Sequence, residues 1–199
     1  MDARQALLLR QLLSGSPGLD HASDLARALT SGRHTAGGLL LVGTPDDEPW
    51  HFGAHLDDEA RWAGVPELAP TWVRWNPPPG APPHLAVGMD RLAAAGRGET
   101  LLVATPTGAI DPLLERVSDA RRHGALILAV EGAPTELQSL AHEAVTAGGD
   151  GATVGYDLTT HLVSVAAGES ASGRTRTVRT RLRDRIGRML DRVSGTEPG

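Results

Sequence analysis

The sequence predicts a three-layer α-β-α sandwich around a parallel sheet of four or five strands, with flanking N- and C-terminal helices. Three observations indicate this fold class. Short apolar runs bounded by glycine or proline are typical of parallel strands buried on both faces. Strand and helix patterns alternate through residues 100–147, as in units joined by right-handed crossovers. A chain of 199 residues with 40% hydrophobic side chains is also long enough to bury one substantial core.

The chain before residue 100 is expected to contain three helices and two strands. The apolar stripe of the first helix is Leu8, Leu9, Leu12 and Leu13. Ser16 and Pro17 then give the cap and first-turn signal of a second helix. Its apolar stripe is Ala22, Leu25, Ala26 and Leu29. Residues 38–43 and 71–75 are predicted strands, and the proline-rich residues 76–80 interrupt the chain before a helix predicted over 84–95.

The middle of the chain gives the clearest pattern. Residues 100–104 form an apolar run, residues 105–109 a loop rich in threonine and glycine, and Asp111 and Pro112 the start of a helix that ends at His123 and Gly124. A further apolar strand is predicted over 125–130 and a helix over 135–147.

The pattern is looser toward the C-terminus. Residues 148–151 indicate a turn, 161–167 a short apolar segment that we expect to be helical, and 169–173 a linker. Residues 178–193 form an amphipathic segment, and residues 174–192 contain eight Arg and two Asp. The predicted organisation is one domain over 1–168, followed over 169–199 by a linker, an arginine-rich helix and a short tail.

Composition excludes several kinds of chemistry. The chain has no cysteine, which rules out disulfides, iron–sulfur clusters, thiolate zinc sites and cysteine nucleophiles. All 19 basic residues are arginine, so Schiff-base catalysis and the lysine of a phosphate-binding P-loop are excluded as well. The net charge of −5 argues against a surface that coats nucleic acid.

The first thirteen residues do not have the pattern of an export signal. Arg10 and Gln11 interrupt the apolar run, and Asp2 removes the positive start that such signals have. No stretch of the sequence approaches the roughly 20 apolar residues that a membrane span needs. We therefore expect a cytoplasmic protein without a membrane partner.

The loop after the middle strand is the strongest candidate for a binding site. A helix N-terminus offers unpaired N–H groups and partial positive charge, and the hydroxyls of Thr105 and Thr107 add hydrogen-bond donors. Ligands of such sheets bind beyond the carboxyl ends of the strands, where this loop lies. The alternative is that the two threonines only complete the turn and cap the helix, with Asp111 as the cap.

Residues 100–145 resemble the sugar isomerase (SIS) family of phosphosugar-binding domains. In that family a strand ends in a Ser-x-Ser-Gly-x-Thr/Ser loop that binds the sugar phosphate, and Thr105, Thr107, Gly108 and Ile110 stand at the matching positions. The helix ending at residues 120–125, the strand that follows it and residues 140–144 are also similar to the family. The resemblance implies an SIS/flavodoxin-like sandwich and a homodimer. It also implies a phosphate site at Thr105, Thr107, Gly108 and Ala109, with Thr44 from the end of the first strand.

The sequence departs from the family pattern at several positions. Ile110 replaces a hydroxyl residue, and Val145 stands where the family has Asp. The family's first strand ends in a Gly-x-Gly-x-Ser loop. Here Gly43, Thr44 and Pro45 are followed by the acidic residues 46–48, which would repel an anion. A phosphosugar isomerase also needs a positioned base. The titratable candidates are His55, Glu59, Glu131 and His161, and each is interpreted as an ordinary surface or core-edge residue.

Two further features are better explained by packing. His51, His55 and Glu59 recur every four residues, which is a metal-ligand spacing on a helix, but the order of known zinc helices is absent and no metal is predicted. All four Trp lie between Trp50 and Trp75. Trp72 and Trp75 are expected to fill opposite faces of the sheet rather than stack on a ligand.

The arginine-rich helix has three interpretations: a solvated helix docked by its apolar stripe, a helix packed across a dimer, or a contact for nucleic acid or an acidic protein patch. Nucleic acid is disfavoured because the run contains Asp184 and Asp191 and no aromatic residues. The candidate partner-binding residues are Arg179, Arg181, Arg183 and Arg188.

The sequence as a whole therefore predicts an SIS-like domain that binds a phosphorylated sugar or another small anionic ligand without a cofactor. Its output would be regulatory, through a protein partner, with little or no catalysis. A sugar-phosphate isomerase of the phosphoheptose type is the first alternative. A ligand-free interaction scaffold that uses the arginine-rich helix is the second.

Overall fold

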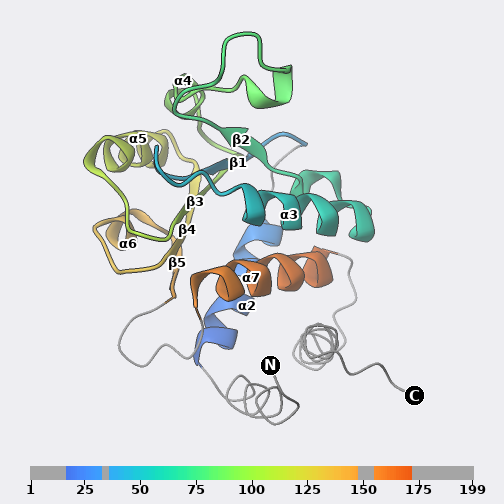
Figure 1. Cartoon of the computed structure of the whole chain (residues 1–199). Coiled ribbons are helices and arrows are strands. Elements are labelled where there is room, and N and C mark those ends of the chain that lie inside the picture. Colours follow the sequence, from blue (N-terminus) through green and yellow to red (C-terminus); the bar gives the residue numbers. More distant parts are fainter. Residues whose placement is uncertain (1–16, 33–35, 148–154, 172–199) are drawn as a thin grey trace.

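A computed structural model describes residues 17–32, 36–147 and 155–171 (Figure 1). Its centre is a five-stranded, all-parallel sheet with the strand order β2-β1-β3-β4-β5. The strands are β1 (Leu39–Val42), β2 (Thr71–Val73), β3 (Thr100–Thr105), β4 (Leu126–Glu131) and β5 (Glu143–Thr146). The predicted parallel α/β fold is confirmed.

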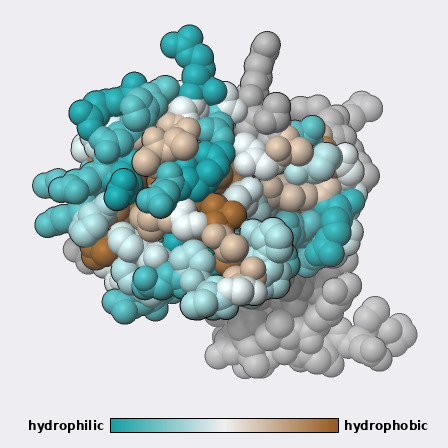
Figure 2. All heavy atoms as spheres, turned by 90° about the horizontal axis from the view of Figure 1, so that it is seen from above, coloured by the Kyte–Doolittle hydropathy of each residue, from teal (hydrophilic) through white to brown (hydrophobic). Residues whose placement is uncertain are grey.

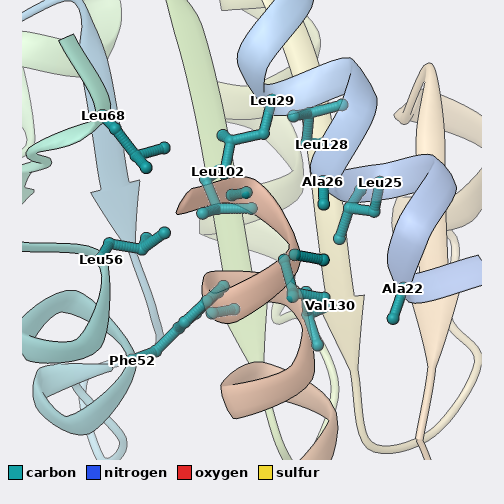
Figure 3. Packing of buried hydrophobic residues seen from close by; sticks show 14 of the residues in the cluster. Ala22, Leu25, Ala26, Leu29, Phe52, Leu56, Leu68, Leu102, Leu128 and Val130 are labelled. Carbon is teal, nitrogen blue, oxygen red and sulfur yellow. The ribbon is translucent and has the colours of Figure 1, made fainter. Parts of the chain in front are cut away.

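Three helices cover one face of the sheet, namely α2 (Pro17–Ser31), α3 (Trp50–Ala63) and α7 (Tyr156–Ala171). The predicted stripe of α2 is correct, because Ala22, Leu25, Ala26 and Leu29 are fully buried against the sheet (Figure 3). Side chains alternate along β3, so that Leu102 and Ala104 face these helices.

The other face is covered by α4 (Asp90–Ala93), α5 (Asp111–Arg122) and α6 (Leu137–Leu140), with Leu101 and Val103 of β3 beneath them. Two short 3-10 turns, η1 (Pro66–Leu68) and η2 (Pro83–Leu85), lie in the connections. The sheet is therefore enclosed on both sides, as its apolar strands require.

The helix predicted over 84–95 is wrong. Residues 83–85 form η2, and only the single turn α4 is helical after it. Between them the chain is held against the end of β2, because the Arg74 N–H donates to the Val87 carbonyl at 2.9 Å and Arg74 bridges Gly88. Pairing with a distant strand therefore prevails over the local apolar pattern.

The helix predicted over 135–147 is also wrong. The chain forms the single turn α6 and then leaves it in an extended conformation at Ala141. It continues as β5, which pairs with β4 from Leu128↔Glu143 to Glu131↔Thr146. The His142 N–H donates to the Ile127 carbonyl at 2.8 Å, and the Ile127 N–H donates to His142 Nδ1 at 2.9 Å. Hydrogen bonds to β4 thus decide the structure of this segment.

Smaller differences concern element ends. The strand predicted over 71–75 ends at Val73. The apolar segment 161–167 is helical as predicted, but α7 begins at Tyr156 and continues to Ala171, so residues 169–171 are helix rather than linker. The first predicted helix, the turn at 148–151 and the arginine-rich helix lie outside the described residues. The division of the chain at residue 168 stays a prediction.

On the side shown in Figure 2, hydrophobic residues form small patches separated by hydrophilic ones. The large hydrophobic side chains that are exposed are Trp50, Trp62 and Ile110. Within the described ranges, every helix is too short or too polar to cross a membrane.

Candidate functional site

The strand order places a topological switch point between β1 and β3. The chain runs from β1 outward to β2 and then returns to the opposite side of β1 to form β3. Connections that diverge in this way leave a crevice beyond the carboxyl ends of the two strands, where ligands of open parallel sheets bind. Thr44 follows β1 and Thr105 ends β3, so both predicted hydroxyl residues belong to this edge.

Thr105 is fully buried, and its hydroxyl oxygen has no hydrogen-bond partner. Its carbonyl accepts hydrogen bonds from the Gly132 N–H at 2.9 Å and from the Gly108 N–H at 3.4 Å. Gly108 closes the turn with a φ of +99°, a left-handed conformation that favours glycine. The Thr105 carbonyl is therefore fixed by two backbone hydrogen bonds, while its hydroxyl remains able to bond to a ligand.

The start of α5 is not capped by a side chain. Ile110 is the N-cap residue, and no side-chain hydrogen bond caps the helix there. The alternative interpretation, in which a threonine or Asp111 caps this helix, is therefore wrong. Thr107 is exposed and Ala109 is half-buried in the same loop. The loop thus presents one exposed threonine beside the start of a twelve-residue helix, where Pro112 has no N–H and the N–H groups of Leu113 and Leu114 donate to the Ile110 carbonyl.

Thr44 lies in a tight turn beside this loop. It is 4% exposed, and its N–H and carbonyl are both bonded at 3.2 Å to the backbone of Asp47. Gly43 permits this close packing, since a Cβ there would lie 2.2 Å from the Asp47 carbonyl oxygen and 3.2 Å from that of Ala104. Thr44 can therefore offer a ligand its side chain but not its amide.

The acidic run after Thr44 is partly neutralised. Glu48 forms a salt bridge with Arg74 at 2.9 Å, and both side chains are largely buried. The Arg74 guanidinium also lies 4.9 Å from the centre of the Trp50 ring. Asp46 is exposed and Asp47 half-buried. The repulsion that the sequence predicts for an anion is thus weakened at Glu48.

Two buried polar groups lie close to this edge of the sheet: Glu131, which the sequence offers as a candidate base, and the Tyr156 hydroxyl, which the sequence does not single out. Glu131 ends β4, in register with Thr105, and is fully buried. One of its carboxylate oxygens accepts the Thr135 hydroxyl, whereas Oε2 has no hydrogen-bond partner. Tyr156 begins α7, and its buried hydroxyl is also unpartnered. Burial raises the pKa of Tyr156 far above its usual value, and Asp47 and Asp157 raise it further.

Two of the four tryptophans, Trp72 and Trp75, pack on opposite faces as predicted, whereas Trp50 and Trp62 are exposed. Trp72 lies against the core on the α3 side and Trp75 against the opposite core. Trp50 meets Trp72 edge-to-face, with 4.6 Å between ring centres, and a Cβ on Gly53 would lie 2.1 Å from Trp72 Nε1. A shallow surface depression lies between Trp50, Trp72 and the Arg74 ion pair.

Three histidines meet between α3 and α7. His55 Nε2 lies 3.1 Å from His51 Nε2 and 3.2 Å from His161 Nδ1, and its ring stands edge-on to both. Glu59, the third residue of the predicted spacing, is buried where α3 meets Gly168 of α7. Within residues 17–32, 36–147 and 155–171, no three His, Asp or Glu side chains are placed to share a metal ion.

Protonation of this histidine cluster is expected to destabilise the protein. Burial lowers the pKa of His55, the charge of His51 lowers it further, and Asp58 opposes the shift. Because the unfolded chain then binds the proton more tightly, stability is complete above the ordinary imidazole pKa of about 6.5 and is lost as the pH falls below it. Thermal melts between about pH 8 and pH 5 should show this loss, and His55→Phe should reduce its slope. The same change at the exposed His84 should leave the slope unchanged, and an equal slope in all three proteins would contradict the prediction.

Comparisons with known proteins identify the fold. No protein-family model and no curated protein matches the chain. A Salmonella typhimurium LT2 structure assigned as a sugar-binding protein covers 94% of this chain at 20% identity and a TM-score of 0.58. A Silicibacter pomeroyi DSS-3 structure assigned as a phosphosugar isomerase covers 94% at 16% identity and a TM-score of 0.59. A second Salmonella typhimurium LT2 structure assigned as a phosphosugar isomerase covers 90% at 12% identity and a TM-score of 0.57.

The chain therefore has an α/β fold of the SIS type, and the predicted resemblance is confirmed at the level of fold. It spans 52%, 53% and 51% of the lengths of these three structures. What those proteins bind or catalyse does not follow for this chain from structural likeness alone.

Proposed function

We propose that this chain binds a phosphorylated sugar or a similar anionic metabolite at the edge between β1 and β3. Thr44, Thr105, Thr107, Gly108 and Ala109 would form the site. The observation that supports this most directly is that the buried hydroxyl of Thr105 has no hydrogen-bond partner. Thr105 is the last residue of β3, and the helix that follows has no side-chain cap. A phosphate would accept hydrogen bonds from the loop and gain from the partial positive charge of the helix N-terminus.

The proposed output is regulatory, with little or no catalysis, in a homodimer that contacts a protein partner. The departures from the SIS loop pattern at Ile110 and after Gly43 support a site that holds a ligand without turning it over. The proposed contacts for the partner are Arg179, Arg181, Arg183 and Arg188.

One observation favours the enzymatic alternative. Glu131 is a buried carboxylate at the same edge of the sheet, and burial raises its pKa, with hydrogen bonds from Thr135 and Gln138 opposing the shift. A general base works best when its pKa lies near the working pH. A sugar-phosphate isomerase would use Glu131 in that role, and the Glu131→Gln variant would then lose turnover while it retains ligand.

Thermal unfolding against a panel of sugar phosphates, each paired with its unphosphorylated sugar, tests the proposal. A ligand at about 100 times its dissociation constant adds about 2.7 kcal/mol, a shift of several degrees in Tm. A phosphosugar is expected to stabilise the protein and its parent sugar is not. Thr107→Val should abolish the shift, because it removes the exposed hydroxyl of the loop.

The matched control is Thr71→Val, which makes the same change at the opposite, amino edge of the sheet and should leave the ligand shift intact. If no phosphosugar raises Tm even at millimolar concentration, the anion site is refuted and the interaction scaffold becomes the better account. Removal of residues 174–199 separates the remaining alternatives, since ligand binding alone should tolerate it better than binding to a partner.

A further inference from the structure

Glu131 is an unusual neighbour for an anion site. It is paired in register with Thr105 across β3 and β4, and both residues are fully buried. Side chains at paired positions point to the same face of a parallel sheet, here the face covered by α5 and α6. The Glu131 carboxyl group and the Thr105 hydroxyl therefore lie side by side under the proposed phosphate loop.

The loop that follows Thr105 and the loop that follows Glu131 pack tightly against each other. A Cβ on Gly132 would lie 1.8 Å from the Pro106 carbonyl oxygen, and a Cβ on Gly108 would lie 2.8 Å from Thr135 Cγ2. Packing this close leaves no bulk water between Glu131 and the residue 105–109 loop. Charge on the carboxylate would consequently act on a bound anion at a low effective dielectric constant.

In the described part of the chain, Arg121 of α5 reaches α6, but its hydrogen bonds go to the Ser139 and Leu140 carbonyls and not to Glu131. The ionisable residue of α5 that follows the residue 105–109 loop most closely is Asp111, and in the turn before α6 it is Glu136. Both are acidic and exposed. β5 presents Thr146 beside Glu131, and Thr146 is bonded to Gln138 at 2.6 Å. The hydrogen bonds that Glu131 receives come from the neutral residues Thr135 and Gln138.

A phosphate and an ionised Glu131 would therefore repel each other, and this repulsion would oppose the attraction of the phosphate to the start of α5. The Glu131 Oε2 atom and the Thr105 hydroxyl are both buried without a hydrogen-bond partner, so a hydrogen bond between them requires a rotation of one of the two side chains. A protonated carboxyl group at this position could donate its O–H to Thr105 Oγ1, and the threonine O–H would then be directed to the ligand.

We propose that anion binding by this chain is linked to protonation of Glu131, so that the site takes up its anion together with one proton on the Glu131 carboxylate. The inference rests on the proposed function, and it adds a specificity-determining residue to that site. Burial also raises the pKa of Glu131, which brings its titration closer to neutral pH. Anion affinity then falls as the pH rises, because binding requires a proton and the proton concentration of the solution is lower.

Inorganic sulfate is the appropriate probe, since its charge is constant over the range of about pH 5 to 9, whereas a phosphate ester titrates near pH 6. Its affinity for the wild-type protein should fall with rising pH, by at most tenfold per pH unit, which is the limit for linkage to one proton. Calorimetry of sulfate binding in buffers of different ionisation enthalpy should show net proton uptake. This second readout requires no variant.

Glu131→Gln is nearly isosteric and cannot ionise. It should remove most of the pH dependence and bind sulfate on the order of tenfold more tightly than wild type at pH 8. Glu136→Gln is the matched control, because it removes an exposed carboxylate from the same connection between β4 and α6 and should retain the wild-type slope. Equal slopes in wild type and Glu131→Gln, with no proton uptake, would overturn the inference while the anion site stands. Failure of every one of these proteins to bind sulfate or phosphate would overturn the proposed function itself.

Discussion

Replacing Gly132 with alanine is expected to lower the free energy of unfolding by about 3 kcal/mol, at the upper end of the usual range for overpacking. A Cβ at this position would lie 1.8 Å from the Pro106 carbonyl oxygen and 2.7 Å from its carbonyl carbon. These are backbone atoms, so no side-chain rotation can relieve the overlap. Moving the loops apart would also stretch the hydrogen bond from the Gly132 N–H to the Thr105 carbonyl. Equilibrium unfolding in urea measures the loss.

The same substitution should abolish stabilisation by a phosphosugar, because the loop that begins at Thr105 would be displaced. Gly155→Ala is the matched control. A Cβ there meets nothing within 4 Å, and the residue has no left-handed φ, so both stability and the ligand shift should be retained. A Gly132→Ala protein as stable as wild type would show that the close approach of the two loops is not needed for folding.

The parts of the fold that could be predicted from sequence are those decided locally. Strands β1, β3 and β4 are buried on both faces, so each reads as an uninterrupted apolar run. Helix α5 has proline at its start and one apolar face, and its sequence needs no distant partner to be recognised. Residues 84–95 and 135–147 have similar apolar spacing. Their structure is decided by hydrogen bonds to Arg74 and Ile127, which the local sequence does not reveal.

The candidate site also contains some residues that could be predicted from local sequence and others that could not. The Thr105 loop could be predicted because strand, loop and helix follow one another along the chain. Glu131 is a charged residue at the end of an apolar strand, which is a visible signal, but its register with Thr105 depends on strand order. His161 lies 106 residues from His55 and reaches it only because α7 packs on α3. Contacts of this kind depend on the assembled fold.

Truncation of Leu102 to alanine should cost about 2–5 kcal/mol, the range for deleting a large buried side chain and leaving part of its cavity. Leu102 lies on the central strand β3, is fully buried and faces the core covered by α2, α3 and α7 (Figure 3). At about 2–4 °C per kcal/mol for a chain of this size, Tm should fall by roughly 10 °C. Leu114→Ala deletes the same atoms at a half-buried position on α5 and should cost clearly less.

Leu102→Ala and Thr107→Val should differ in a way that separates global stability from the binding site. Leu102 is directed away from the residue 105–109 loop, so its loss lowers Tm but should leave the phosphosugar-induced rise in Tm almost unchanged. Thr107 is exposed, so its loss should leave Tm almost unchanged but remove that rise. If Leu102→Ala also lost the ligand response, the loop would depend on core packing beneath it. Binding would then be a property of the whole sheet and not of the β1–β3 edge.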